Sequence, residues 1–166
     1  LLVHGQQNGT GFSVESLFLL DHQLLHFFLR DPVQVAPALL GTILDIPPVA
    51  IRITETEAYR GPDDSASHAR HGLTKRNLPM WGAPGRTYIY LCYGIHYLFN
   101  IVTCPDGEAG AILLRSGEVW QGREAVRRRC PNHDPGYLIG PGNLTKGLCI
   151  DHTLNDRPID RPPFTL

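Results

Sequence analysis

The sequence predicts an α+β protein, a single domain spanning residues 1–166 and built on a mainly antiparallel, curved β-sheet flanked by short helices. Three observations lead to this prediction. Runs rich in β-branched and aromatic residues alternate with short turns. Glycine (17) and proline (14) are abundant, as expected of many short strands and turns. An apolar fraction of 42% and a charged fraction of 19% are typical of a globular domain.

The first half of the chain predicts two helices and two strands. Residues 1–12 are predicted to be a loose segment, rich in Gly, Gln and Asn. Ser13 is an N-cap candidate, and apolar residues at helical spacing predict a helix to about Leu29. A second short helix is predicted from Pro32 to Gly41, with Gly41 as its stop. Strands TILDI and VAIRITETEAY follow, joined across two prolines.

The second half predicts a hairpin, a further strand and two helices. After a loop region between Tyr59 and Gly85, RTYIYLCYGIHYLFNIVT predicts two strands that meet near Gly94. The turn PDGEAG leads to a strand, AILLRSGEV, and then to a short helix, GREAVRRR. A loop feeding a helix is predicted in IGPGNLTKGLCI. Short turns between successive strands favour antiparallel pairing.

Composition excludes several classes of protein. The most apolar stretch, LFLLDHQLLHFFL, is broken by polar residues and is too short to cross a bilayer, so no membrane partner is predicted. The four cysteines show no CxxC pair and are interpreted as reduced thiols of an intracellular protein. His68-x-x-His71 with Asp63 and Asp64 is a candidate metal site, but no further ligand falls at a recognisable spacing, so neither metal nor cofactor is predicted.

The charge distribution favours a nucleic-acid partner, although the net charge of −1 does not. No Asp or Glu occurs from Ser65 to Pro105, whereas this window contains Arg70, Lys75, Arg76 and Arg86. A solvated loop face is the alternative interpretation. The window coincides with the aromatic-rich part of the chain, which favours binding to nucleic acid.

A possible catalytic group lies at the end of a predicted strand. Glu55, Glu57 and Tyr59 share one face of that strand, and a carboxylate there can act as a general base. The alternative is the solvent face of an edge strand. Arg115 either points inward and needs a carboxylate partner such as Glu57, or lies on the surface at a strand end. Tyr88, Tyr90 and Tyr93 are core residues or a base-stacking and wedge set.

With these residues assembled, the chain resembles the alkyladenine (3-methyladenine) DNA glycosylase family from about Val35 to Asp151. The resemblance is carried by ETEAY-x-G-P-x-D, a histidine nine residues after the tyrosine, and Y-x-Y-x-x-YG with a following asparagine. Further matching pieces are APALLGTIL, Arg76-Asn77 with Met80-Trp81, AILLRS and GPGNLTKGLCI.

The resemblance implies roles for individual residues. Glu57 matches the glutamate that activates the attacking water. Arg115 matches the arginine that holds this carboxylate and the water. The remaining matches are Tyr59, His68 and Tyr90, which sandwich the flipped base, Asn100, which disfavours the 2-amino group of guanine, and Tyr93, which fills the vacated stack. Arg70, Lys75, Arg76, Arg86 and Lys146 are expected to contact the DNA backbone. Glu55 has no assigned role and is interpreted as structural.

The function implied is that of a monofunctional DNA N-glycosylase of base excision repair. It would act as a monomer on double-stranded DNA and excise 3-methyladenine, 7-methylguanine or hypoxanthine, in bacterial cytoplasm and nucleoid or in a eukaryotic nucleus. Family members continue past the Asp151 region into further sheet residues, so a truncated C-terminus is one expectation. A catalytically impaired DNA-damage-binding protein is therefore the rival, and a metal-dependent hydrolase using His68 and His71 a more distant one.

Overall fold

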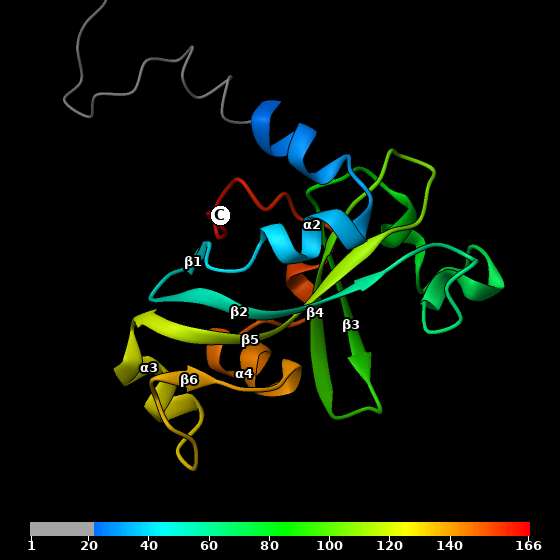
Figure 1. The fold of residues 1–166 in the computed structure, drawn as a ribbon. Coiled ribbons are helices and arrows are strands. Elements are labelled where there is room, and N and C mark those ends of the chain that lie inside the picture. Colours follow the sequence, from blue (N-terminus) through cyan, green and yellow to red (C-terminus); the bar gives the residue numbers. More distant parts are fainter. Residues whose placement is uncertain (1–21) are drawn as a thin grey trace, which may run out of the picture.

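One antiparallel sheet organises the protein, and it confirms the predicted fold class (Figure 1). The computed structural model describes residues 22–166. The strands are β1 (Ile43–Ile46), β2 (Val49–Tyr59), β3 (Thr87–Cys92), β4 (His96–Val102), β5 (Ala111–Gln121) and β6 (Tyr137–Leu138). Their order is β1-β2-β5-β4-β3, with β6 paired to β5, and every pairing is antiparallel.

The helices are short. They are α2 (Pro32–Ala38), α3 (Arg123–Arg129) and α4 (Pro141–Leu148). Residues 22–28 are helical, in agreement with the first predicted helix; its predicted beginning and the predicted loose segment 1–12 lie outside the described residues. Within residues 22–166, no helix has the length and apolar character needed to cross a membrane.

Helix α2 begins as predicted and ends earlier. The Asp31 side chain accepts a hydrogen bond from the Val33 amide at 2.8 Å, and Pro32 occupies the first turn, where its missing N–H is not needed. The helix ends at Ala38. Gly41 instead adopts a φ of +85° in the following turn, where its amide donates to the Ile53 carbonyl at 2.8 Å. The turn therefore docks the chain onto β2 before β1 begins.

Four short elements were not predicted from the sequence. They are strand β6 and the 3₁₀ turns η1 (His68–His71), η2 (Leu78–Trp81) and η3 (His152–Leu154). Each is too short to produce a periodic pattern of apolar residues. Two of the turns divide the predicted Tyr59–Gly85 loop region into ordered pieces.

Two apolar clusters lie on opposite sides of the sheet. In the larger cluster, strand residues such as Ile112 and Leu114 pack with Leu39, which follows α2, and with Leu144 of α4. The smaller cluster contains Ala69, Met80, Tyr88, Val102, Ala109 and Ala111. Because Tyr88, Val102 and Ala111 each precede or follow a residue of the larger cluster in their strands, they point to the other face. The 3₁₀ turns η1 and η2 cover that face.

Strand β2 is irregular where its glutamates begin. Its pairing with β5 changes register between Ile53 and Glu55 and again between Glu55 and Thr56. Bulges of this kind bend a strand, increase its twist and re-aim side chains. The register then places Glu57 opposite Leu113 of β5, two residues before Arg115.

The last residues of the chain pack against the sheet. Asp45 and Thr165 exchange two backbone hydrogen bonds, at 2.8 and 3.0 Å. The ring of Phe164 is fully buried and stacks on that of Phe99, with centroids 5.6 Å apart. This segment thus extends the larger apolar cluster beyond the last helical turn.

Candidate active site

Glu57 and Arg115 form an ion pair across β2 and β5. Nη1 of Arg115 donates to Oε1 of Glu57 at 2.8 Å, and both side chains are part-buried. The hydroxyl of Tyr59 donates to the other carboxylate oxygen, Oε2, at 2.6 Å. Arg115 therefore has the carboxylate partner expected for it, while its side chain stays 31% exposed.

Glu55 completes the surroundings of the same arginine. Its Oε1 accepts from Nε of Arg115 at 3.0 Å, and its Oε2 accepts from the hydroxyl of Ser116 at 2.8 Å. The Ser116 oxygen in turn accepts the amide of Gly140, which precedes α4, at 3.2 Å. A continuous line of hydrogen bonds thus runs from the start of α4 to Glu57.

The surroundings shift the pKa values of Glu55, Arg115 and Tyr59. The hydrogen bond from Ser116 lowers the pKa of Glu55, and Arg115 lowers it further against the opposing effect of burial. Burial opposes the charged form of Arg115, but Glu57 and Glu55 outweigh it and raise the pKa of the guanidinium. Burial, reinforced by Glu57, raises the pKa of Tyr59, so its phenol stays protonated and donates.

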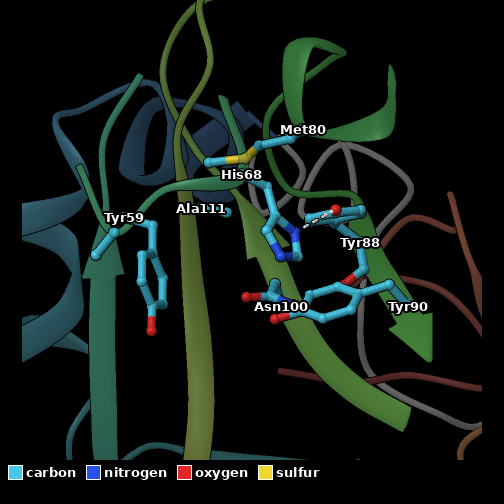
Figure 2. A pocket seen from close by; sticks show the side chains of 8 residues that line it. Tyr59, His68, Met80, Tyr88, Tyr90, Asn100 and Ala111 are labelled. Carbon is cyan, nitrogen blue, oxygen red and sulfur yellow. Dashed lines mark hydrogen bonds between the residues drawn. The ribbon is translucent and has the colours of Figure 1, made fainter. Parts of the chain in front are cut away.

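A pocket lined mainly by aromatic side chains opens beside this network (Figure 2). Tyr59 lies on one side of it, and His68 and Tyr90 lie on the other. The complete lining is Tyr59, Ala66, His68, Met80, Tyr88, Tyr90, Asn100 and Ala111. Strands β2, β3, β4 and β5 and turn η1 each contribute a side chain. Because Tyr59 also contacts Glu57, the pocket and the carboxylate share one residue.

Turn η1 holds His68 in the pocket wall. The side chain of Ser67 accepts the Ala69 amide at 3.0 Å and caps the turn. The buried side chain of Asn77 donates to the His68 carbonyl at 2.9 Å and to the Gly72 carbonyl at 3.0 Å. These bonds fix a segment that has no strand or α-helix of its own.

The rings opposite Tyr59 are coupled to one another. Nδ1 of His68 lies 2.9 Å from the hydroxyl of Tyr88, and its ring lies edge-on to that of Tyr90, with centroids 4.5 Å apart (Figure 2). Burial, followed by the charges of Arg76 and Arg70, lowers the pKa of His68. Burial raises the pKa of Tyr90 to about 12. Neutral rings therefore face the pocket at neutral pH.

Asn100 occupies the floor of the pocket on β4. Its side chain is 3% exposed, and its amide nitrogen donates to the Tyr88 carbonyl at 3.0 Å. This bond fixes the orientation of the amide, since the nitrogen and oxygen cannot exchange places without losing it. The pocket thus has a rigid polar floor between aromatic walls.

Tyr93 lies outside the pocket, at the tip of the β3–β4 hairpin. Its side chain is 94% exposed, and its φ is +50°, with Gly94 at +70°. A type I′ turn has positive φ at both central residues, and this backbone conformation is unfavourable for tyrosine. An exposed aromatic residue held in a strained backbone conformation is a common feature of functional sites.

The basic residues expected to contact DNA lie in different surroundings. Arg76 donates to the Leu91 carbonyl and lies over the Tyr90 ring, 5.5 Å from its centroid. Arg70 follows His68 in η1, and Lys75 and Lys146 are exposed. Arg86 forms an ion pair with Asp156. Arg70 and Arg76 thus lie nearest the aromatic pocket, while Arg86 already has an acidic partner.

The structure adds residues to which the family resemblance assigned no role. Tyr88 lines the pocket and contacts His68, and Met80 and Ala111 complete the wall. The alternation of Tyr88 and Tyr90 along one strand was the available signal for Tyr88. For the metal alternative, residues 22–166 contain no group of three or more His, Cys, Asp or Glu arranged to hold an ion.

Comparisons with known proteins identify the class of protein. A family model described as methylpurine-DNA glycosylase matches residues 26–166. Proteins of Nitrosococcus oceani and Frankia casuarinae, provisionally named 3-methyladenine DNA glycosylases, are each 49% identical to this chain. These matches cover 82% and 84% of the chain, and 68% and 67% of the two relatives. A DNA-3-methyladenine glycosylase of Arabidopsis thaliana is 41% identical, over 82% of the chain and 54% of the plant protein.

The fold, the site and these matches define an enzyme of the DNA N-glycosylase class, a hydrolase of DNA repair. The chain belongs to the methylpurine-DNA glycosylase family. The predicted family is therefore confirmed, and the individual roles of the site residues remain predictions.

Proposed function

We propose that this protein excises 3-methyladenine and related alkylated or deaminated purines from double-stranded DNA, with Glu57 activating the attacking water. The single observation that carries the proposal is the position of Glu57. It lies between a cation, Arg115, and a phenol, Tyr59, that also lines the aromatic pocket. A base bound in that pocket would have its glycosidic bond near the carboxylate.

The damaged nucleotide must leave the base stack before it can enter the pocket. Unstacking costs a few kcal/mol, and less for a damaged pair. Tyr93, at the hairpin tip and almost fully exposed, is free to enter the gap that the nucleotide leaves. Aromatic insertion between base steps compensates for lost stacking in DNA-bending proteins.

The pocket favours a cationic purine. Tyr59, His68 and Tyr90 present neutral rings, and a cation over an aromatic face is stabilised by about 0.5–2 kcal/mol. 3-Methyladenine in DNA carries such a positive charge, whereas an undamaged purine does not. Asn100, fixed on the pocket floor, would crowd the 2-amino group of guanine. Together these features select damaged bases by charge and by shape.

The chemistry is a hydrolysis of one carbon–nitrogen bond. Water attacks C1′ of the deoxyribose, a C1′–oxygen bond forms, and the C1′–nitrogen bond breaks. Its electron pair goes to the purine, which leaves as a neutral base when the lesion is cationic and as an anion that takes up a proton from solvent when the lesion is neutral. Glu57 takes the proton of the water; each carboxylate oxygen retains a free lone pair beside its bond to Arg115 or Tyr59. The products are an abasic site and the free base.

The test is release of 3-methyladenine from methylated duplex DNA by wild type, Glu57→Gln and the control Glu118→Gln, with and without EDTA. We expect EDTA-resistant release by wild type and the control, and a loss of roughly 10²- to 10⁴-fold in Glu57→Gln. Affinity for the lesion duplex should persist in Glu57→Gln. Release that needs a metal would contradict the proposal, and binding without release by wild type would favour the DNA-damage-binding protein.

A further inference from the structure

Glu55 is the second carboxylate of the Glu-x-Glu pair, and the mechanism above does not use it. Its two oxygens accept hydrogen bonds from Nε of Arg115 at 3.0 Å and from Ser116 at 2.8 Å. Its side chain is 49% exposed, so these two hydrogen bonds are not needed to satisfy a buried charge. The bonds to Arg115 and to its neighbour Ser116 therefore indicate a specific role for this carboxylate.

We propose that Glu55 is a positioning residue, which fixes Arg115 and thereby sets the orientation of Glu57. This inference rests on the proposed role of Glu57 in activating water. Glu55 itself would touch neither the substrate nor the attacking water.

The first part of the argument is geometric. The guanidinium group is planar, so a bond from Nε to Glu55 also fixes the direction in which Nη1 points. Nη1 then meets Glu57 at 2.8 Å. Without Glu55, the long side chain of Arg115 would have only one fixed contact in the network and several rotatable bonds. Arg115 would still lie beside Glu57, but its guanidinium would no longer be held in one orientation.

The anchor extends into the framework of the protein. Ser116 follows Arg115 on β5 and donates to Glu55, while its oxygen accepts the Gly140 amide at 3.2 Å. Gly140 is the residue before α4, and α4 packs into the larger apolar cluster. Hydrogen bonds therefore connect Arg115 to the start of α4 as well as to strands β2 and β5.

The second part of the argument concerns charge. Arg115 lies between two carboxylates, with Glu55 at 3.0 Å and Glu57 at 2.8 Å. Against the opposing effect of burial, both carboxylates raise the pKa of its guanidinium. Arg115 is therefore held by two acidic partners, and removal of the charge of Glu55 would weaken that hold.

The experiment compares the single-turnover rate of 3-methyladenine excision at neutral pH. The variants are Glu55→Gln and Ser116→Ala, and the control is Glu118→Gln. Glu118 is a carboxylate on the same strand that pairs with Arg52 of β2 at 3.3 Å, outside the site. All proteins are also measured for lesion-duplex affinity and for thermal unfolding.

We expect Glu55→Gln to lower the single-turnover rate about tenfold, because Arg115 loses a charged partner and no longer holds Glu57 in one orientation. Ser116→Ala should lower the rate by a smaller factor. Lesion affinity and unfolding temperature should match those of the control.

Two results would overturn the inference. One is a Glu55→Gln rate identical to that of the control. The other is a fall in rate that comes with weaker lesion binding and a lowered unfolding temperature, which would make Glu55 merely structural. Failure of the proposed function has a different signature, namely retention of excision by Glu57→Gln, so the two failures can be told apart.

Discussion

The hydroxyl of Tyr59 donates to Oε2 of Glu57 at 2.6 Å, so one residue lines the base pocket and also holds the carboxylate beside it. The two residues are neighbours on one face of β2, separated only by Ala58. This contact couples the occupancy of the pocket to the carboxylate, because a base that displaces the Tyr59 ring also moves a partner of Glu57. Two functions of Tyr59 can therefore be separated by mutation.

Tyr59→Phe keeps the ring and removes the hydrogen bond. A bond to a charged group contributes about 1.5–3 kcal/mol, so we expect the excision rate to fall roughly 10- to 100-fold. Affinity for the lesion duplex should change less than about twofold, since the stacking surface remains. Single-turnover kinetics and equilibrium binding measure the two effects, with Tyr59→Ala as the variant that should lose both. An unchanged rate in Tyr59→Phe would show that the bond has no part in catalysis.

Tyr93→Asn is expected to stabilise the protein and to impair recognition of damage. Tyr93 has a φ of +50°, a conformation that costs an ordinary L-residue about 1–2 kcal/mol and asparagine less. We expect the free energy of unfolding to rise by about 0.5–1 kcal/mol. Affinity for a lesion duplex should fall about tenfold or more, because the aromatic ring is lost.

Denaturant unfolding and duplex binding test this trade-off, and affinity for the free base should stay constant. Tyr137→Asn is the matched control, since Tyr137 is also exposed and lies on β6, away from the hairpin. Equal loss of lesion affinity in the two variants would contradict the assignment of Tyr93 as the inserting residue.

His68 is predicted to titrate below the ordinary value for histidine. Burial, then Arg76 and Arg70, disfavour its charged form and lower the pKa of the imidazole. Because the folded pKa lies below the unfolded value, the free energy of unfolding should fall as the pH drops through about 6.5 and level off below the folded pKa. An NMR titration of the His68 ring measures this directly. Arg76→Gln should raise the value toward normal, and a wild-type value above the ordinary one would refute the prediction.

Much of the site could be predicted from sequence because strand alternation is regular over short distances. That rule places Glu57 and Tyr59 on one face and makes Arg115 a candidate partner. The hydrogen bond between Tyr59 and Glu57 and the role suggested for Glu55 could not be predicted. They depend on how side chains are aimed near the register shifts of β2 at Ile53 and Glu55, which leave no periodic signal.

Other features depend on residues that are distant in the sequence. The fold brings Arg86 to Asp156, and local sequence contains no sign of that pairing; its contact with DNA stays a prediction. The position of His68 likewise depends on hydrogen bonds from Asn77, which lies in the next turn rather than in a neighbouring strand. A sequence pattern can indicate which residues are candidates for the site, whereas tertiary hydrogen bonds decide where loop residues lie.

Asn77→Ala should therefore loosen the pocket wall without unfolding the sheet. Asn77 is 2% exposed; it donates to the carbonyls of His68 and Gly72 and accepts the Thr74 amide at 2.6 Å. Loss of each of these part-buried hydrogen bonds costs about 0.5–1.5 kcal/mol, and the cost falls on a segment that packs on the smaller apolar cluster. We expect faster proteolysis within residues 60–85 and at least about tenfold weaker lesion binding.

The control for this prediction is Asn143→Ala, since Asn143 also donates to a backbone carbonyl, that of Ile139 at 2.9 Å, but lies in α4. Limited proteolysis followed by mass spectrometry locates the loosened segment, and circular dichroism reports the sheet. Because the larger apolar cluster does not contain the Asn77 segment, the main unfolding transition should move little. If Asn77→Ala instead resisted proteolysis like the control and bound lesions normally, the turns η1 and η2 would be held by packing alone, and the hydrogen bonds of Asn77 would not be what positions His68.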